Sequence, residues 1–202
     1  MIKYQLNFRT VRISDITHLV DLINSAYRQQ EGRSWTSESE IVAGDRINAK
    51  QLEQALTQDN FQLFVAELEE QIVACIGLTF TQHDVEIGTF CIAAQLQNQG
   101  IGKYVLDFAE RYVHDKVLSN PCHFTHFVMW VLSVRYELIA YYQRRGYVQT
   151  GEVADYPLTT NVGLPIVDLH LIEMRKSVKS SVSSNYNKTL NKSGFYCFKF
   201  WI

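Results

Sequence analysis

A short glycine-containing segment, QLQNQGIGKYV over residues 95–105, has the composition of an anion-binding loop. Gly100 and Gly102 lie one residue apart, between a strand-like run and a helix-like run. Glycines permit unusual backbone angles and close approach by a ligand, so successive N–H groups can point at one anion. The N-terminus of a following helix would add partial positive charge. The segment therefore predicts a phosphate or pyrophosphate site.

Two common phosphate-binding patterns fit this segment poorly. A nucleotide-hydrolysing P-loop needs an earlier glycine and a hydroxyl residue after its Gly-Lys pair, but the chain has Gln97 and Tyr104 at these positions. A dinucleotide-binding fingerprint needs a third glycine where the chain has Val105, and it normally follows the first strand of a domain. Nucleotide hydrolysis and hydride transfer are therefore disfavoured.

A third frame, Gln97-x-x-Gly100-x-Gly102, follows an apolar strand that contains Phe90 and Ile92. A later helix-like segment reads Leu138-Ile139-Ala140-Tyr141-Tyr142-Gln143-Arg144-Arg145-Gly146-Tyr147. Together the two segments resemble the GCN5-related N-acetyltransferase (GNAT) family, whose Gln/Arg-x-x-Gly-x-Gly/Ala loop holds the pyrophosphate of acetyl-CoA. The resemblance extends over roughly residues 3–176 when the order of strands and helices is included.

Three positions depart from the family pattern. Ala94 replaces a proline, Leu138 replaces an alanine, and Arg135 stands where many members have an asparagine that contacts the cofactor. The resemblance implies an acetyl-CoA-dependent N-acetyltransferase that acts by direct attack of an amine. The departures leave open an alternative, a non-catalytic acyl-CoA sensor or interaction module on the same fold.

The resemblance also implies which residues hold acetyl-CoA. The backbone of Phe90, Cys91 and Ile92 would pair with the pantetheine arm, and the Ile92 N–H would bind the oxyanion. A bulge in this strand would separate it from the strand at 127–134 and open a slot. The pyrophosphate would be held by the loop residues Gln97, Asn98, Gln99, Gly100, Ile101, Gly102 and Lys103. The Lys103 ammonium would either add a charge or remain solvated.

Tyr142 matches the family tyrosine that protonates the departing thiolate, so the resemblance implies a general acid there. Helical spacing alone would explain Tyr142 as a residue that packs on the sheet. A primary amine is mostly protonated at neutral pH, so a base or a water relay is also expected. Glu86 is the candidate base, with a solvated strand residue as the alternative; the weaker candidates are Asp84, His83, Glu137 and Asp155.

The acceptor side is less defined by the sequence. Trp35 either lines a substrate pocket or packs in the core. The segment 31–45 contains Glu31, Glu38, Glu40 and Asp45 against Arg33, which is either an acidic rim for a cationic amine or solvated surface. Cys122, His123 and His126 have no second pair of ligands to complete a zinc site, so we expect no metal.

The elements that position these residues follow from hydrophobic periodicity. Strands are predicted at 3–13, 61–68, 71–80, 84–92, 127–134, 147–153 and 166–174. Helices are predicted from an N-cap at Ser14 to about residue 29, from Asn48 to about 58, after the glycine loop, and over 135–145 with Gly146 at its C-terminus. Residues 30–47 read as a loop with a short helical turn. An acidic turn at Glu69 and Glu70 predicts an antiparallel meander.

This order predicts a single α/β (α+β) domain with a mixed, mostly antiparallel twisted sheet of about seven strands and helices on both faces. The domain is expected to span residues 3–176. The Ser/Asn/Lys-rich segment 177–202, with its aromatic end, is predicted to be a flexible tail or to mediate self-association.

Composition supports a globular domain, with 47% hydrophobic and 20% charged residues. The net charge of −2 argues against a nucleic-acid partner, and we expect no membrane partner because no apolar run is long enough to span a bilayer and no secretory leader is visible. Four scattered cysteines, Cys75, Cys91, Cys122 and Cys197, predict reduced thiols and a cytoplasmic protein. We expect a monomer or homodimer.

Overall fold

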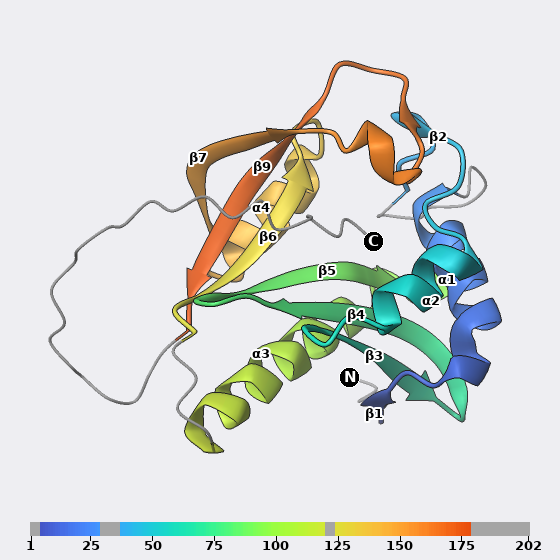
Figure 1. Cartoon of the computed structure of the whole chain (residues 1–202), viewed down its shortest axis with the longest axis vertical. Coiled ribbons are helices and arrows are strands. Elements are labelled where there is room, and N and C mark those ends of the chain that lie inside the picture. The colour runs from blue at the N-terminus through green and yellow to red at the C-terminus, as the bar shows by residue number, and fades with distance from the viewer. Residues whose placement is uncertain (1–4, 29–36, 120–123, 179–202) are drawn as a thin grey trace, which may run out of the picture.

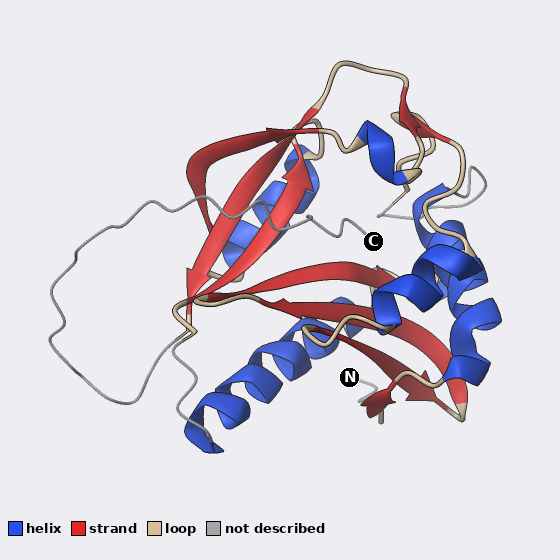
Figure 2. Cartoon of the chain, viewed as in Figure 1, coloured by secondary structure: helices blue, strands red, loops and turns tan. Residues whose placement is uncertain are grey.

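A seven-stranded sheet forms the centre of the computed structural model, which describes residues 5–28, 37–119 and 124–178. The strands lie in the order β1-β3-β4-β5-β6-β9-β7, and only the β5–β6 pair is parallel (Figures 1 and 2). Their bounds are β1 Asn7–Thr10, β3 Phe61–Leu68, β4 Gln71–Phe80, β5 Asp84–Ile92, β6 His126–Leu132, β7 Val148–Asp155 and β9 His170–Ser177. The predicted fold class and the mostly antiparallel sheet are confirmed.

Strands β3, β4 and β5 form the predicted meander. The turn between β3 and β4 consists of Glu69 and Glu70, whose φ angles are 50° and 65°. Positive φ at both central residues is the requirement of a tight two-residue hairpin turn whose twist matches that of the strands. The turn thereby fixes the register of the hairpin, with Leu68 opposite Gln71.

A β-bulge in β5 reverses which side chains face each side of the sheet. Cys75 pairs with Cys91 and Gly77 with Gly88, so one residue of β4 opposes two residues of β5. Thr89 is one of these two and has a φ of 45°. Because one residue is added, the alternation of side chains shifts by one position after the bulge.

Core packing shows the result of this shift. Before the bulge, Val85 and Ile87 belong to the core beneath α3 (Ile101–Ser119) and α4 (Tyr136–Arg144). After the bulge, Ile92 joins that core, whereas Cys91 joins the core beneath α1 (Ile16–Arg28) and α2 (Ala49–Leu56). The helices therefore cover both faces of the sheet, as predicted.

Strands β5 and β6 separate soon after they meet. They pair over only three positions, from Asp84 with His126 to Glu86 with Val128. Figure 1 shows the two strands close together at one end and diverging toward the other. The bulge and this divergence confirm the expected slot between the strands.

Several element boundaries differ from the sequence predictions. The first strand is limited to Asn7–Thr10, and a short 3-10 turn, Ile13–Asp15, precedes α1. Ser14 is not the cap, because Asp15 accepts the Arg12 N–H at 2.7 Å. The predicted capping box of α2 is confirmed, since Asn48 and Gln51 exchange side-chain and backbone hydrogen bonds.

The two C-terminal strands, β7 and β9, begin and end later than predicted. β9 begins at His170 instead of 166, because Ile166 donates its N–H to the carbonyl of Ile41. This contact lies beside a small second sheet that the sequence did not indicate. That sheet pairs β2 (Val42–Ala43) with β8 (Leu164–Pro165), which a 3-10 turn, Leu158–Thr160, precedes. β9 continues to Ser177 because β6 offers partners back to His126, and Val178 is buried. The rest of the predicted tail, 179–202, lies outside the described residues.

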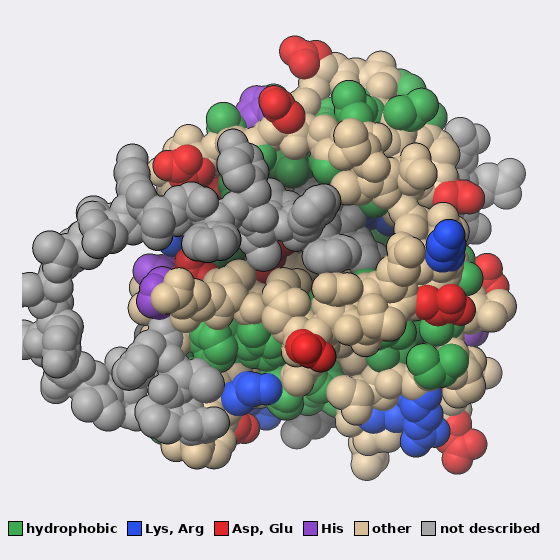
Figure 3. Space-filling model, viewed as in Figure 1, with side chains coloured by type: hydrophobic (Ala, Val, Ile, Leu, Met, Phe, Trp, Pro, Cys, Tyr) green, Lys and Arg blue, Asp and Glu red, His purple; other side chains and the backbone are tan. Residues whose placement is uncertain are grey.

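Surface charge and apolar length bear on the expected partners. On the face seen in Figure 3, the described Lys and Arg side chains are interspersed with Asp and Glu and form no continuous basic band. Within the described ranges, no helix has the length and apolar character that crossing a membrane requires. The predictions on nucleic-acid and membrane partners stay predictions.

Candidate functional site

Two neighbouring cavities meet where β5 and β6 diverge. The first, here called the loop cavity, has a volume of about 400 Å³ and is lined by loop 97–103 and the last turn of α4. The second, the strand cavity, is about 70 Å³ and is lined by β5, β6 and residues around α1. The residues that contact both cavities are Tyr27, Phe90, Arg135, Leu138 and Tyr142.

The wall of the loop cavity has the backbone geometry of an anion-binding turn. Asn98 and Gly100 have φ angles of 60° and 82°, and α3 begins immediately afterwards at Ile101. Residues with positive φ just before a helix make the N–H groups of the turn converge, and the helix N-terminus adds positive potential. A Cβ on Gly100 would meet nothing within 4 Å, so the glycine is needed for its angle and not for space.

Three cationic side chains surround this turn. Lys103 lies in the first turn of α3, and Arg144 and Arg145 lie at the end of α4; all three line the loop cavity. Two elements that are distant in sequence therefore place positive charge on one cavity. A diphosphate group carries the complementary charge and geometry, so a pyrophosphate fits this cavity.

The end of β5 presents main-chain groups to the slot. Ala93 donates its N–H to Val73 at 2.8 Å, so the N–H and C=O of its neighbour Ile92 point away from β4. The Ile92 carbonyl accepts the Gln97 side chain at 3.0 Å, and the Phe90 carbonyl accepts the Tyr27 hydroxyl at 2.8 Å. These two bonds hold the strand in place where the Ile92 N–H faces the slot.

The main chain around the end of α4 fixes the position of Tyr142. Gly146, with a φ of 88°, donates to Gln143, and Tyr147 donates to Tyr142 at 3.1 Å. These bonds form a Schellman motif, in which a left-handed residue closes the helix. Tyr142 is buried, and burial, with the nearby Tyr141 in addition, raises its pKa well above 10.0. The hydroxyl therefore stays protonated at neutral pH, as a general acid must be before it acts.

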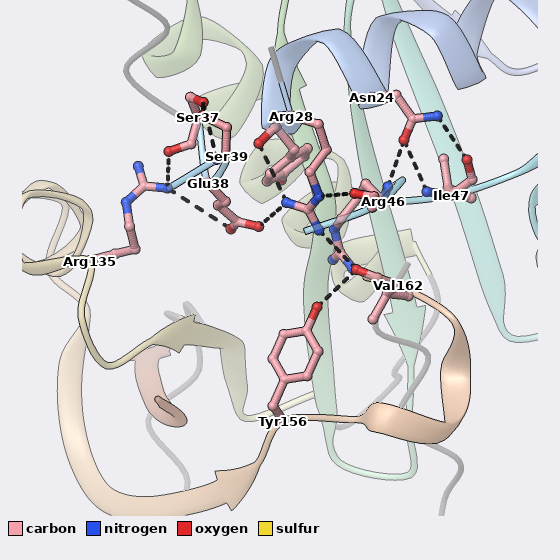
Figure 4. Close-up of polar contacts among 12 residues, drawn as sticks. Asn24, Arg28, Ser37, Glu38, Ser39, Arg46, Ile47, Arg135, Tyr156 and Val162 are labelled. Carbon is pink, nitrogen blue, oxygen red and sulfur yellow. Dashed lines mark hydrogen bonds and ion pairs between the residues drawn. The ribbon is translucent and has the colours of Figure 1, made fainter. Parts of the chain in front are cut away.

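The strand cavity contains a buried network of charges. Glu38 pairs with Arg28 at 2.6 Å and lies 4.0 Å from Arg135 (Figure 4). Arg135 also pairs with the half-exposed Glu137. Of the predicted acidic rim, only Glu38 among the described residues lines the cavity, and it faces arginines. Glu40 and Asp45 are exposed and line neither cavity, and Glu31 lies outside the described residues, so the acidic rim stays a prediction.

A comparison with protein-family models identifies the domain. Residues 59–149 match the model described as Acetyltransferase (GNAT) domain. The chain contains a GNAT acetyltransferase domain. The match runs from β3 to the start of β7, which includes loop 97–103 and Tyr142, and it confirms the resemblance read from these two segments. No curated protein matches the sequence.

Solved structures share the GNAT fold at low sequence identity. The ribosomal-protein-S18-alanine N-acetyltransferase of Escherichia coli has 12% identity and a TM-score of 0.64, over 91% of this chain and 100% of that one. A chimera of the spermidine N-acetyltransferase SpeG from Vibrio cholerae with hSSAT has 15% identity and a TM-score of 0.60, covering 86% and 96% of the chains. An N-acetyltransferase from Staphylococcus aureus has 11% identity and a TM-score of 0.64, over 86% and 98%.

The structure brings together most of the predicted site residues of the GNAT domain. Phe90, Ile92 and the loop residues Gln97, Asn98, Gly100, Gly102 and Lys103 line the loop cavity, and Tyr142 and Glu86 line the strand cavity. Three predicted side chains point elsewhere. Cys91 faces Cys75, with the sulfur atoms 3.4 Å apart, Gln99 donates to Gln95, and Ile101 is buried in the core. These three residues can contribute only main-chain groups.

The remaining predictions concern the weaker candidates for the general base, Trp35 and the possible metal ligands. Two of the weaker base candidates, Asp84 and Glu137, do not line the strand cavity. Asp84 instead pairs with Arg175 and His126, and Glu137 pairs with Arg135. Trp35, Cys122 and His123 lie outside the described residues. The expectation of no metal therefore stays a prediction.

Sequence reasoning missed several residues of the GNAT site, namely Tyr27, Arg46, Leu138, Arg144 and Arg145. Arg144 and Arg145 could have been found, because a basic pair in the last turn of the helix that carries Tyr142 must lie close to the same site. Tyr27 and Arg46 belong to segments without a motif, and only tertiary packing shows their proximity.

Proposed function

We propose that this protein transfers the acetyl group of acetyl-CoA to an amine bound in the strand cavity. The observation that carries the proposal is the position of Tyr142 at the junction of the two cavities. An acetyl donor anchored in the loop cavity and an amine in the strand cavity would meet beside this hydroxyl. Holding two reactants in contact removes much of the entropic cost of their encounter.

The loop cavity supplies binding for the donor. The N–H groups of loop 97–103 and the N-terminus of α3 would hold the pyrophosphate, and Lys103, Arg144 and Arg145 would balance its charge. The open edge of β5 at Phe90 and Ile92 would receive the pantetheine arm alongside the strand. Because these groups are fixed by the fold, little reorganisation is needed on binding.

The chemistry requires three groups around the thioester. The amine nitrogen forms a bond to the acetyl carbon, the carbonyl oxygen becomes an oxyanion, and the carbon–sulfur bond then breaks. The Ile92 N–H would stabilise the oxyanion, and the Tyr142 hydroxyl would protonate the departing thiolate. Glu86, which lies where β5 and β6 separate, would accept the amine proton directly or through water.

A test of this function measures thiol release from acetyl-CoA with a panel of amines, together with the affinity for acetyl-CoA by calorimetry. We expect acetyl-CoA to bind and at least one amine to accelerate thiol release above hydrolysis. Binding without turnover on any amine would favour the alternative, an acyl-CoA sensor. Failure to bind acetyl-CoA would remove both.

Location and assembly are proposed on sequence grounds alone. We propose a cytoplasmic protein that acts as a monomer or homodimer and needs no nucleic-acid or membrane partner. Truncation after Val178 and measurement of the mass in solution would test the suggested role of the tail in self-association. An unchanged mass would remove that role.

A further inference from the structure

The inner wall of the strand cavity is rich in arginine. Arg46, Arg135 and Glu38 line it, and each is less than a tenth exposed. Glu38 binds Arg28 and lies near Arg135, as Figure 4 shows. The cavity therefore presents two guanidinium groups beside a carboxylate that is already paired with Arg28, and a guanidinium can bind the carboxylate of a ligand through charge-assisted hydrogen bonds.

Arg46 is held close to the proposed reaction centre. Its guanidinium carbon lies 5.4 Å from the centre of the Tyr27 ring, and the Tyr27 hydroxyl donates to the Phe90 carbonyl at 2.8 Å. The main chain of Arg46 is fixed as well, because Asn24 accepts its N–H at 2.7 Å. Arg46 therefore lies against the ring of a tyrosine that is hydrogen-bonded to β5 at Phe90.

Glu86 gives the same cavity a site of opposite charge. It belongs to β5, at the last position where β5 pairs with β6, and is partly buried. Among described residues, the charged groups that line the strand cavity are Glu38, Arg46, Glu86 and Arg135. The cavity therefore offers the guanidinium groups of Arg46 and Arg135 and the Glu86 carboxylate on β5, within a volume of only about 70 Å³.

We infer that the acceptor is a small amine that carries a carboxylate next to its amino group, as a free amino acid does. The inference rests on the proposed function. The carboxylate would bind Arg46, assisted by Arg135, because a guanidinium matches a carboxylate through two parallel hydrogen bonds. The ammonium would face Glu86 and lose its proton there before attack. A polyamine is disfavoured because its further cations would face the arginines, and a peptide N-terminus lacks the adjacent carboxylate.

The test compares matched acceptors that differ in the carboxylate alone. Thiol release from acetyl-CoA is measured with free amino acids, with their amides and with the corresponding decarboxylated amines. We expect kcat/KM to be roughly 10- to 100-fold higher for the acids, the range expected for hydrogen bonds to a charged group. Equal or higher values for the amides, the simple amines or spermidine would overturn the inference and leave the proposed acetyl transfer standing.

Arg46→Met removes the proposed carboxylate partner. It should abolish the preference for the acids, so that their kcat/KM equals that of the amides, and leave the affinity for acetyl-CoA unchanged, because Arg46 does not line the loop cavity. Arg46→Lys keeps the positive charge but loses the paired donors, so its kcat/KM for the acids should lie between those of the wild type and Arg46→Met. This variant tests the inference if Arg46→Met does not fold. Arg111→Met, on the exposed side of α3, is the matched control.

If no acceptor is turned over, binding of the acids and the amides tests the inference. The protein saturated with coenzyme A is titrated with the acids and with the amides by calorimetry. Binding of the acids alone supports the inference, and equal or absent binding of both series overturns it. Loss of acetyl-CoA binding would instead contradict the proposed function.

Discussion

Tyr147 donates its main-chain N–H to the carbonyl of Tyr142 at 3.1 Å, and the two rings meet edge to face with their centroids 5.9 Å apart. Gly146 lies between them with a φ of 88°. The spacing Tyr-x-x-x-Gly-Tyr is therefore the sequence form of a helix C-terminus closed by a left-handed glycine. The motif positions the Tyr142 hydroxyl through main-chain geometry. The Tyr147 side chain makes a separate hydrogen bond, to Glu110.

Gly146→Ala should reduce both stability and activity. A Cβ at this position has space, since the nearest atoms are side-chain carbons of Lys176 at 3.8 and 3.9 Å, so the cost comes from the left-handed backbone. We expect a loss of about 1 kcal/mol in the free energy of unfolding, measured by urea denaturation. kcat should fall as well, because the end of α4 sets the position of Tyr142.

Gly151→Ala is the matched control for this substitution. Gly151 also has a φ of 88° and lies in the exposed edge strand β7, where an added Cβ would meet no atom within 4 Å. It should lose similar stability with unchanged kcat. If both variants lose activity equally, the reduction follows from general destabilisation and not from displacement of Tyr142.

Tyr142→Phe should lower kcat by roughly 10²- to 10⁴-fold, the usual contribution of a general acid, with little change in acetyl-CoA affinity. Steady-state kinetics and calorimetry measure the two quantities. Tyr141→Phe is the control, since Tyr141 is adjacent and lines only the loop cavity. An unchanged kcat in Tyr142→Phe would show that Tyr142 only packs on the sheet.

The pH dependence of the wild-type enzyme provides a second measurement of the same role. Burial raises the pKa of Tyr142 above 10.0, so the proton stays available for donation at and beyond the pH where an exposed tyrosine would lose it. We therefore expect kcat to show no alkaline decline up to pH 10. A decline centred between pH 8 and 9 would contradict the assignment.

Local features of this site could be predicted from sequence because each is encoded in a few consecutive residues. The left-handed positions at Asn98 and Gly100, the helix start at Ile101 and the helix end at Gly146 depend on nearby backbone only. The meander around Glu69 and Glu70 is equally local. Their spacing therefore indicated the fold and the loop cavity.

The acceptor side could not be predicted in this way. Arg46 and Tyr27 approach β5 only after α1 packs on the sheet, and Glu38 is buried by ion pairs whose partners are distant in sequence. A count of acidic residues over 31–45 could not show that Glu38 faces arginines. The bulge at Thr89 was expected from the resemblance alone, since strand residues on both sides of it are apolar.

Arg144→Gln and Arg145→Gln should weaken acetyl-CoA binding. Both residues line the loop cavity and are at least partly exposed, so we expect each to raise KM for acetyl-CoA about 5-fold at low salt, with kcat unchanged at saturation. Repeating the titration at several salt concentrations should show a smaller salt dependence in the variants. Arg111→Gln should match the wild type, and a similar change in that control would indicate a general effect of surface charge.

Asp15→Asn should destabilise the fold at neutral pH and not in acid. Arg9 hydrogen-bonds to the Asp15 carboxylate at 2.7 Å and lowers the pKa of Asp15 below 3.8, although burial acts in the opposite direction. Because the folded-state pKa is the lower one, the stabilisation is complete above the unfolded-state pKa. It is lost as the pH falls through the folded-state pKa.

The expected difference between wild type and Asp15→Asn is about 1 kcal/mol from pH 5 to 8, shrinking below pH 4, when unfolding is followed by urea denaturation across this range. Asp21→Asn, an exposed position on α1, should show no such difference at any pH. A gap that does not shrink as the pH falls below 4 would mean that the substitution acts through packing and not through the charge of Asp15.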